Sequence, residues 1–242
     1  MTVLIDLADY LGEVEAFAAL ADDFVDKSSA LRLSDVVRDL KTGIDLGAAT
    51  WSWQTRQDIV FRPSQAYDGP GRAHIDTWLD LGFKCDFARP KSVQKSKTAW
   101  EIVGSATHVT IRKNDGHLPC HFDYKNGGQW GPQLHFQVSE NVGNLPIPRI
   151  PSTSFLPTDC ADLILSELHH EEWRQLQAAG GSSRHVSVIR SAQEHRTKAY
   201  VENIANMWRG DTKSTRVCML QNYTATVAAL PDRHGRLVAR PW

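Results

Sequence analysis

Cysteine is scarce in this sequence, and the few cysteines lack the spacing that cysteine-based sites require. The 242 residues contain four cysteines with no C-x-x-C pair, namely Cys85, Cys120, Cys160 and Cys218. Neither a zinc knuckle nor a disulfide framework is therefore indicated. Widely separated thiols of this kind are typical of a protein in the reducing cytosol.

Signals for export and for membrane insertion are also missing. No apolar run reaches the roughly 18 residues that a membrane-spanning helix needs. The N-terminal stretch MTVLIDLADYLGEVEAF carries carboxylates where a secretory signal carries Lys or Arg. We therefore predict a cytoplasmic protein without a membrane partner.

Charge of one sign is not in excess, since the net charge is −1 and no block of five like charges occurs. The charge is unevenly spread: residues 1–50 hold ten Asp and Glu against four Lys and Arg, and residues 171–242 hold six against eleven. A basic C-terminal part can bind nucleic acid, or it can pack against acids of the same fold. We expect scattered positions or pairing with acids of residues 1–50 for the basic residues Arg184, Arg190, Arg196, Lys198 and Arg209.

Hydrophobic residues make up 41% of the chain and charged residues 23%, as in ordinary folded proteins.

The first 48 residues predict a pair of helices. Apolar residues recur every three or four positions over 3–26 and again over 29–44. This spacing lays one apolar stripe along each helix.

From about residue 49 the apolar residues recur at every second position, which is typical of strands. Polar connections that contain Pro or Gly separate the alternating segments. Five such segments in sequence predict an antiparallel meander over 49–145. The expected strands cover 50–62, 77–88, 98–112, 118–125 and 132–139.

Residues 146–242 predict a proline-rich crossover followed by helices. The prolines of NLPIPRIPSTSFLPTD exclude a helix and favour an extended passage that leaves the sheet. Thr158 or Asp159 is the expected N-cap of a helix over 160–179, and a further helix is predicted over 186–210. Residues 212–242 fit a helix or a final hairpin, and we favour strands. We thus expect a single α+β domain, with a central antiparallel sheet flanked by N-terminal and C-terminal helices.

The stretch HLPCHFDYKNGGQWGPQLHFQV, residues 117–138, combines a hairpin pattern with several histidines. If its turn is centred near Gly128, Asp123 lies opposite His135, and His121 lies opposite Gln137. These four side chains then share one face of the hairpin. The other face carries the apolar residues Phe122, Tyr124, Leu134, Phe136 and Val138.

Two imidazoles and a carboxylate can hold zinc, iron or manganese and leave positions open for water or substrate. The candidate metal ligands are His121, Asp123 and His135, and Asp123 and His135 are also the candidate catalytic residues. Without a metal, Asp123 could orient His135 as a general base. Short H-x-D patterns recur by chance, so a structural hairpin with a solvated polar face stays open as the alternative.

A second histidine motif is incomplete. The string HHEEW, residues 169–173, begins like the zinc-binding pattern H-E-x-x-H, but Arg174 stands in the place of the last histidine. We therefore predict a solvated helix face here.

Residues 118–170 carry a recognisable order of short patterns: F-D-Y at 122–124, H-x-Q at 135–137 and R-I-P at 149–151, followed by a predicted helix. This order resembles a family of uncharacterised bacterial proteins whose genes lie beside defence or toxin–antitoxin genes. The resemblance implies that the hairpin and Arg149 belong to one unit. Gln137 and Arg149 are accordingly the candidate substrate-binding residues.

Three functions are consistent with these patterns. Because no complete catalytic set is evident, the leading hypothesis is a bacterial cytosolic binding or assembly module with a protein partner, in antiviral defence or a toxin–antitoxin system. The alternative is a metal-dependent hydrolase, a nuclease or phosphodiesterase, that uses the His/Asp/His cluster. The third is nucleic-acid binding through the basic C-terminal part, which strongly salt-dependent affinity would reveal.

Overall fold

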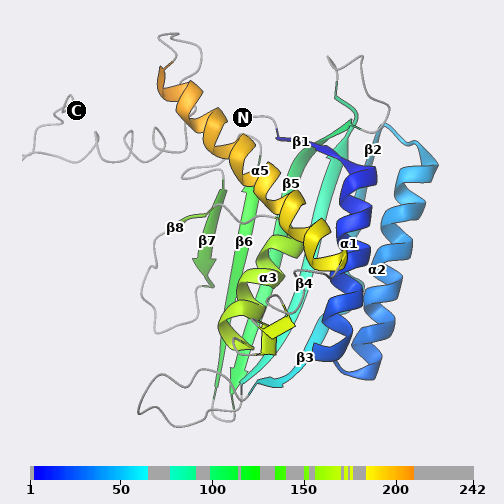
Figure 1. Ribbon diagram of the computed structural model, residues 1–242, viewed down its shortest axis with the longest axis vertical. Coiled ribbons are helices and arrows are strands. Elements are labelled where there is room, and N and C mark those ends of the chain that lie inside the picture. Colours follow the sequence, from blue (N-terminus) through cyan, green and yellow to red (C-terminus); the bar gives the residue numbers. More distant parts are fainter. Residues whose placement is uncertain are drawn as a thin grey trace, which may run out of the picture.

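The structure is a computed structural model that describes residues 3–64, 77–90, 99–113, 116–125, 134–139, 150–152, 156–169, 172–173, 175–176 and 184–209 (Figure 1). It is an α+β fold with one antiparallel sheet, as the sequence predicts. Arg149, Cys218 and the segment 212–242 lie outside the described residues. None of the described helices combines the length and the apolar character that crossing a bilayer requires.

The N-terminal part begins with a strand rather than with a helix. Strand β1 (Val3–Asp6) precedes helix α1 (Leu7–Ala21), a short 3-10 helix η1 (Asp22–Phe24) and helix α2 (Lys27–Leu46). The helix that was predicted to begin at residue 3 therefore begins at Leu7 instead. The reason is that the Asp6 carboxylate caps α1 by accepting hydrogen bonds from the backbone N–H groups of Ala8 and Asp9. The residues before this cap pair instead with the sheet.

Seven further strands complete the sheet, and every pairing in it is antiparallel. The order is β2-β4-β5-β6-β7-β8, β3 also pairs with β4, and β1 pairs with β5. The consecutive pairs from β4 to β7 confirm the predicted meander. The strands are β2 (Thr50–Gln54), β3 (Ile59–Ser64), β4 (Thr77–Ala88), β5 (Ala99–Lys113), β6 (Gly116–Lys125), β7 (Leu134–Val138) and β8 (Ile150–Pro151).

The segment predicted as one strand over 50–62 is interrupted at residues 55–58. Both of its parts, β2 and β3, pair with β4. The side chain of Asp58 folds over Gly82 of β4, where a Cβ atom would lie 2.4 Å from the Asp58 Oδ1 atom. The absence of a side chain at Gly82 therefore makes room for this irregular connection.

The C-terminal part adds one strand and two long helices. The proline-rich segment was expected to leave the sheet, but Ile150–Pro151 pairs with β7 as strand β8. Helix α3 (Pro157–Leu168) follows, and helix α5 (Arg184–Arg209) confirms the helix predicted over 186–210. The N-cap of α3 is Leu156, with Pro157 at the first helical position, so the predicted cap at Thr158 or Asp159 is wrong. Both residues lie inside the first turn.

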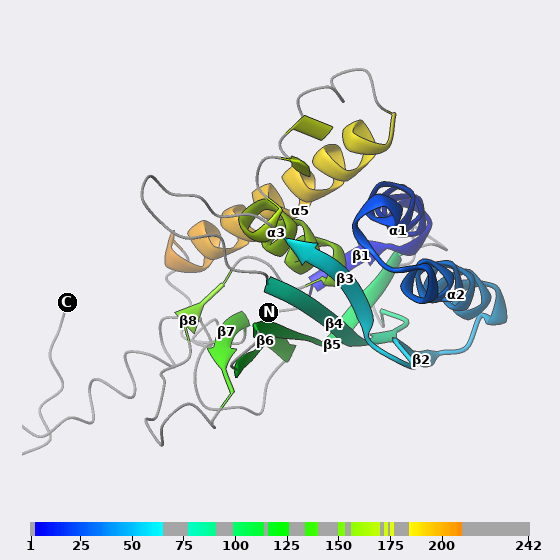
Figure 2. The same ribbon diagram turned by 90° about the horizontal axis from the view of Figure 1, so that it is seen from below.

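The four long helices of the described residues, α1, α2, α3 and α5, lie on one side of the sheet (Figure 2). The core fills the space between them, and it includes the ring of Trp53, whose Nε1–H donates to the Val36 carbonyl over 2.9 Å. Tyr10 of α1 meets the Trp53 ring edge-on at a centroid distance of 5.8 Å. The opposite face of the sheet is covered by no helix of the described residues.

A glycine in α2 lets a tryptophan ring of the sheet pack directly against this helix. Trp51 of β2 packs against the rings of Phe87 and Trp100, at centroid distances of 5.0 and 5.9 Å. A Cβ atom on Gly43 would lie only 2.1 Å from a carbon of the Trp51 ring. The ring is held on its other sides, so it cannot move away freely.

The substitution Gly43→Ala should therefore lower the free energy of unfolding by about 1–3 kcal/mol, because the added methyl group overpacks the layer between helix and sheet. Gly12→Ala in α1 is the matched control, since a Cβ there meets nothing within 4 Å. It should raise the stability by about 0.4–1 kcal/mol, because alanine loses less backbone entropy on folding. Urea unfolding measures both, and equal effects of the same sign would contradict this packing.

A buried ionic cluster joins helices α1, α3 and α5. Glu13 is fully buried, and it accepts hydrogen bonds from Arg196 Nη2 at 2.8 Å, from Arg196 Nη1, and from Thr158 Oγ1 at 2.8 Å. Arg196 Nη2 also donates to Asp159. Burial raises the pKa of Glu13, and the hydrogen bonds from Arg196 oppose this. The pKa of Arg196 is raised because the attraction of Asp159 and Glu13 outweighs the effect of burial.

The cluster confirms for Arg196 the expected pairing of C-terminal basic residues with N-terminal acids. It also explains why Thr158 and Asp159 do not act as helix caps, since both side chains are engaged with this cluster.

Replacing Arg196 by Met should cost about 3–5 kcal/mol of unfolding free energy, because it leaves the Glu13 carboxylate buried without a cation. Adding Glu13→Gln should recover part of this loss. Lys198→Met is the control on the same helix, since Lys198 is exposed, and it should change the stability by less than about 0.5 kcal/mol. If Arg196→Met and Lys198→Met lose equal stability in urea titrations, the cluster is not what holds α5.

Candidate metal centre

The sheet face away from the helices carries a set of polar side chains in register. Strand pairing places His108, His121 and Gln137 in one row, which continues to Gly82 on β4. The neighbouring row is formed by Lys84, Ala106, Asp123 and His135. Side chains in such rows point to the same side of the sheet.

The predicted hairpin register is confirmed. Asp123 pairs with His135, and His121 pairs with Gln137. Three of these side chains converge, with His121 Nε2 at 3.6 Å and His135 Nε2 at 4.0 Å from the same oxygen, Oδ2 of Asp123. One ligand atom from each of the three residues lies within 4.8 Å of the others.

These separations are close to those that a bound metal requires. Zinc binds imidazole nitrogens and carboxylate oxygens at about 2.0–2.2 Å, so neighbouring ligand atoms in a tetrahedral site lie about 3.3 Å apart. The observed 3.6 and 4.0 Å reach this value with small side-chain rotations. His121, Asp123 and His135 therefore lie close enough together to be candidate ligands of one ion.

The burial of the three residues differs from that of a solvated hairpin face. The side chain of His135 is only 1% exposed, whereas those of His121 and Asp123 are 18% and 32% exposed. The Oδ1 atom of Asp123 is buried and makes no hydrogen bond to any described residue. A buried carboxylate oxygen without a partner is costly, and a cation bound by both oxygens of Asp123 would remove that cost.

The ring of His121 is oriented by a polar group on its far side. Its Nδ1 atom lies 3.4 Å from Ser139 Oγ, and the Ser139 backbone N–H donates to the Pro119 carbonyl over 2.9 Å. This contact leaves Nε2 directed toward Asp123. Metal-binding histidines commonly use their second nitrogen in this way, because the contact fixes the ring and its tautomer.

The remaining site residues are distributed as follows. Gln137 lies beside His121 on the same face, as predicted, and Arg149 lies outside the described residues. His108 was not among the predicted site residues. It is exposed on β5, and its ring centroid lies 6.0 Å from that of His121. Pairing 98–112 with 118–125 across the short connection after Lys113 would have placed His108 opposite His121.

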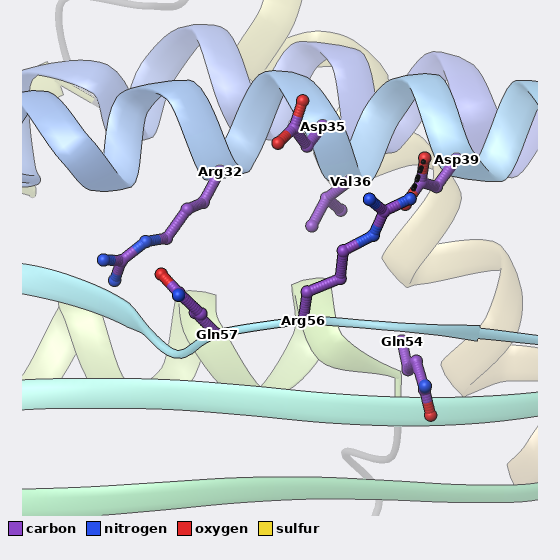
Figure 3. Close-up of a pocket in the computed structure, with 7 residues that line it drawn as sticks. All are labelled: Arg32, Asp35, Val36, Asp39, Gln54, Arg56 and Gln57. Carbon is purple, nitrogen blue, oxygen red and sulfur yellow. Dashed lines mark hydrogen bonds and ion pairs between the residues drawn. The ribbon is translucent and has the colours of Figure 1, made fainter.

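A surface cavity of about 310 Å³ lies between α2 and residues 54–57 (Figure 3). Its guanidinium groups are already engaged, since Arg56 pairs with Asp39 at 3.1 Å and Arg32 donates to the Asp58 carbonyl. No histidine or cysteine lines it. The guanidinium groups of this cavity are thus paired with a carboxylate or with the backbone.

The HHEEW segment contains a core histidine, which corrects the prediction of a solvated helix face. His169 ends α3, is 4% exposed, and meets the Phe24 ring at a centroid distance of 5.3 Å. Burial lowers the pKa of His169, and Glu172, whose Oε2 lies 3.4 Å from His169 Nδ1, opposes this. Burial therefore favours the neutral imidazole of His169, which is the form that packs in the core.

Stability should consequently fall as the pH decreases through about 6.5, the pKa of an unfolded histidine, because the unfolded chain then binds a proton that folded His169 resists. His169→Gln should reduce this dependence, whereas the exposed His185→Gln on α5 should leave it unchanged. Urea midpoints between pH 5.5 and 7.5 measure the effect. An identical pH slope in wild type and His169→Gln would contradict it.

No family model, curated protein or solved structure matches this chain. The chemistry of the site therefore rests on its residues.

Proposed function

We propose that the protein binds one divalent metal ion through His121, Asp123 and His135 and uses it to hydrolyse a phosphodiester. The observation that carries this proposal is the convergence of two imidazoles and one carboxylate within 4.8 Å. Zinc, manganese and iron all accept this ligand set. Three protein ligands leave at least one position open for water, which is the arrangement of catalytic rather than structural zinc sites.

The burial pattern supports a reaction on one side of the ion. His135 closes the inner side, while Asp123 and His121 remain partly accessible, so water and a substrate can approach from the open face of the sheet. A metal held by these three residues would lower the pKa of a bound water toward 7 and so would supply a hydroxide for attack. In this proposal Gln137, which pairs with His121 across β6 and β7, is the side chain that binds the substrate.

A binding or assembly module in the bacterial cytosol, in a defence or toxin–antitoxin system, is the second candidate. It is supported by two exposed apolar side chains on the same open face, Leu4 at 47% and Val103 at 43% exposure. This role needs no metal, which separates it from the first.

Elemental analysis of protein purified without added metal should find close to one equivalent of zinc, manganese or iron. Asp123→Asn should lose most of this metal, because it removes the only carboxylate of the cluster while keeping the shape of the side chain. His135→Ala should lose it as well. The metal-loaded wild type should hydrolyse bis(4-nitrophenyl) phosphate.

His117→Ala is the matched control, since His117 is an exposed histidine on the same face of β6, opposite Arg112. It should retain the full metal content. Circular dichroism should show that the three variants keep the fold. Metal retained in both ligand variants, or absent from wild type even after loading, would rule out the proposed centre.

A further inference from the structure

Lys84 is a cation in the same row of the sheet as two of the candidate metal ligands. Strand pairing places Lys84 opposite Ala106 and Ala106 opposite Asp123, which pairs in turn with His135. Side chains that are paired in this way point to the same side of a sheet. Lys84 therefore shares the open face with Asp123, and only β5 separates the two residues.

The residues of β5 next to Lys84 are small. Ala106 stands in the same row, and Gly104 stands in the next row. Both residues are partly exposed, whereas Gly82 on β4 is buried beneath the side chain of Asp58. The accessible surface beside Lys84 therefore lies over Ala106 and Gly104 rather than over Gly82.

The present partner of Lys84 can be exchanged for another anion. The Nζ atom of Lys84 lies 3.5 Å from Oδ1 of Asp86, and the two side chains are 53% and 41% exposed. Exposed ion pairs are weak, because water and salt screen them and because both side chains lose freedom in forming them. Asp86 also accepts a hydrogen bond from Ser52 Oγ. The Asp86 carboxylate therefore keeps a partner when Lys84 turns away.

The separation between Lys84 and the proposed metal centre suits one phosphate group. Neighbouring strands lie about 4.8 Å apart, so the Cα atoms of Lys84 and Asp123, on the two sides of β5, are about 10 Å from each other. The stem of a lysine side chain covers roughly half of this distance. A phosphate that binds the metal would fill the remaining part, above Ala106.

Building on the proposed hydrolysis, we infer that Lys84 binds one non-bridging oxygen of the phosphodiester while the metal binds the other. The substrate class is therefore an anionic phosphodiester rather than a neutral ester. An ammonium group suits this role because it is a compact charge that donates hydrogen bonds to phosphate oxygens. The charge is needed here because Asp58, over Gly82, and Asp86 lie near Lys84 and would repel an anion without it.

Binding of dimethyl phosphate to the metal-loaded protein, measured by phosphorus NMR titration, tests Lys84 apart from the chemical step. Lys84→Met should weaken this binding by about tenfold or more, because it removes a hydrogen bond between charged groups. It should lower kcat/KM for bis(4-nitrophenyl) phosphate by a similar factor. Lys84→Arg should restore most of both, since it keeps a cation. Both variants should retain the metal, because Lys84 is not a ligand.

Two control variants separate the charge of Lys84 from its surroundings. Asp86→Asn removes the ion pair but keeps Lys84, so it should bind dimethyl phosphate as tightly as wild type or more tightly. Arg112→Met removes a cation from the same face of the sheet, three rows away from Ala106. It should change the binding by less than about threefold, because this separation exceeds the range of screened charges.

Two results would overturn the role of Lys84 and leave the hydrolase proposal standing, provided that wild type is active. One is unchanged binding and kcat/KM in Lys84→Met, and the other is an equal loss in Arg112→Met. A metal-loaded wild type that neither binds dimethyl phosphate nor cleaves the nitrophenyl ester would overturn both proposals.

Discussion

The constraint on which this structure depends is that helices cover only one face of an antiparallel sheet. Successive side chains of a strand point to opposite faces, so each strand divides its residues between a core and an open surface. On β6 this division places Phe122 and Tyr124 under the helices and His121 and Asp123 on the other side. The candidate metal centre is thus a direct consequence of the same alternation that builds the core.

Within the helical layer, the ion pair between Glu13 and Arg196 holds α1 and α5 together. Asp159 joins the pair, so that helices distant in sequence are tied at one buried point. Such a cluster adds specificity of docking, because Glu13 can be buried as an anion only where Arg196 reaches it. An acid from the acidic N-terminal part and a base from the basic C-terminal part thus pair with each other. The pairing favours folding over nucleic-acid binding as the role of Arg196.

The strand register could be predicted because it follows from alternation and from one turn position. Asp123 and His135 were placed opposite each other on these grounds alone, and the structure agrees. What depends on distant contacts could not be predicted in this way. The burial of His135 and of His169 depends on segments far away in sequence, and β1 is a strand because β5 offers it an unpaired edge. His108 was missed for a local reason, since the pairing of its strand with β6 was not considered.

The central claim is that the three converging side chains hold one metal ion. Crystals grown with one equivalent of zinc, with anomalous diffraction data at the zinc edge, test it most directly. The account predicts a single strong anomalous peak about 2.0–2.2 Å from Nε2 of His121, Nε2 of His135 and a carboxylate oxygen of Asp123. A zinc peak bound by other residues, or no peak between these three side chains, would contradict it.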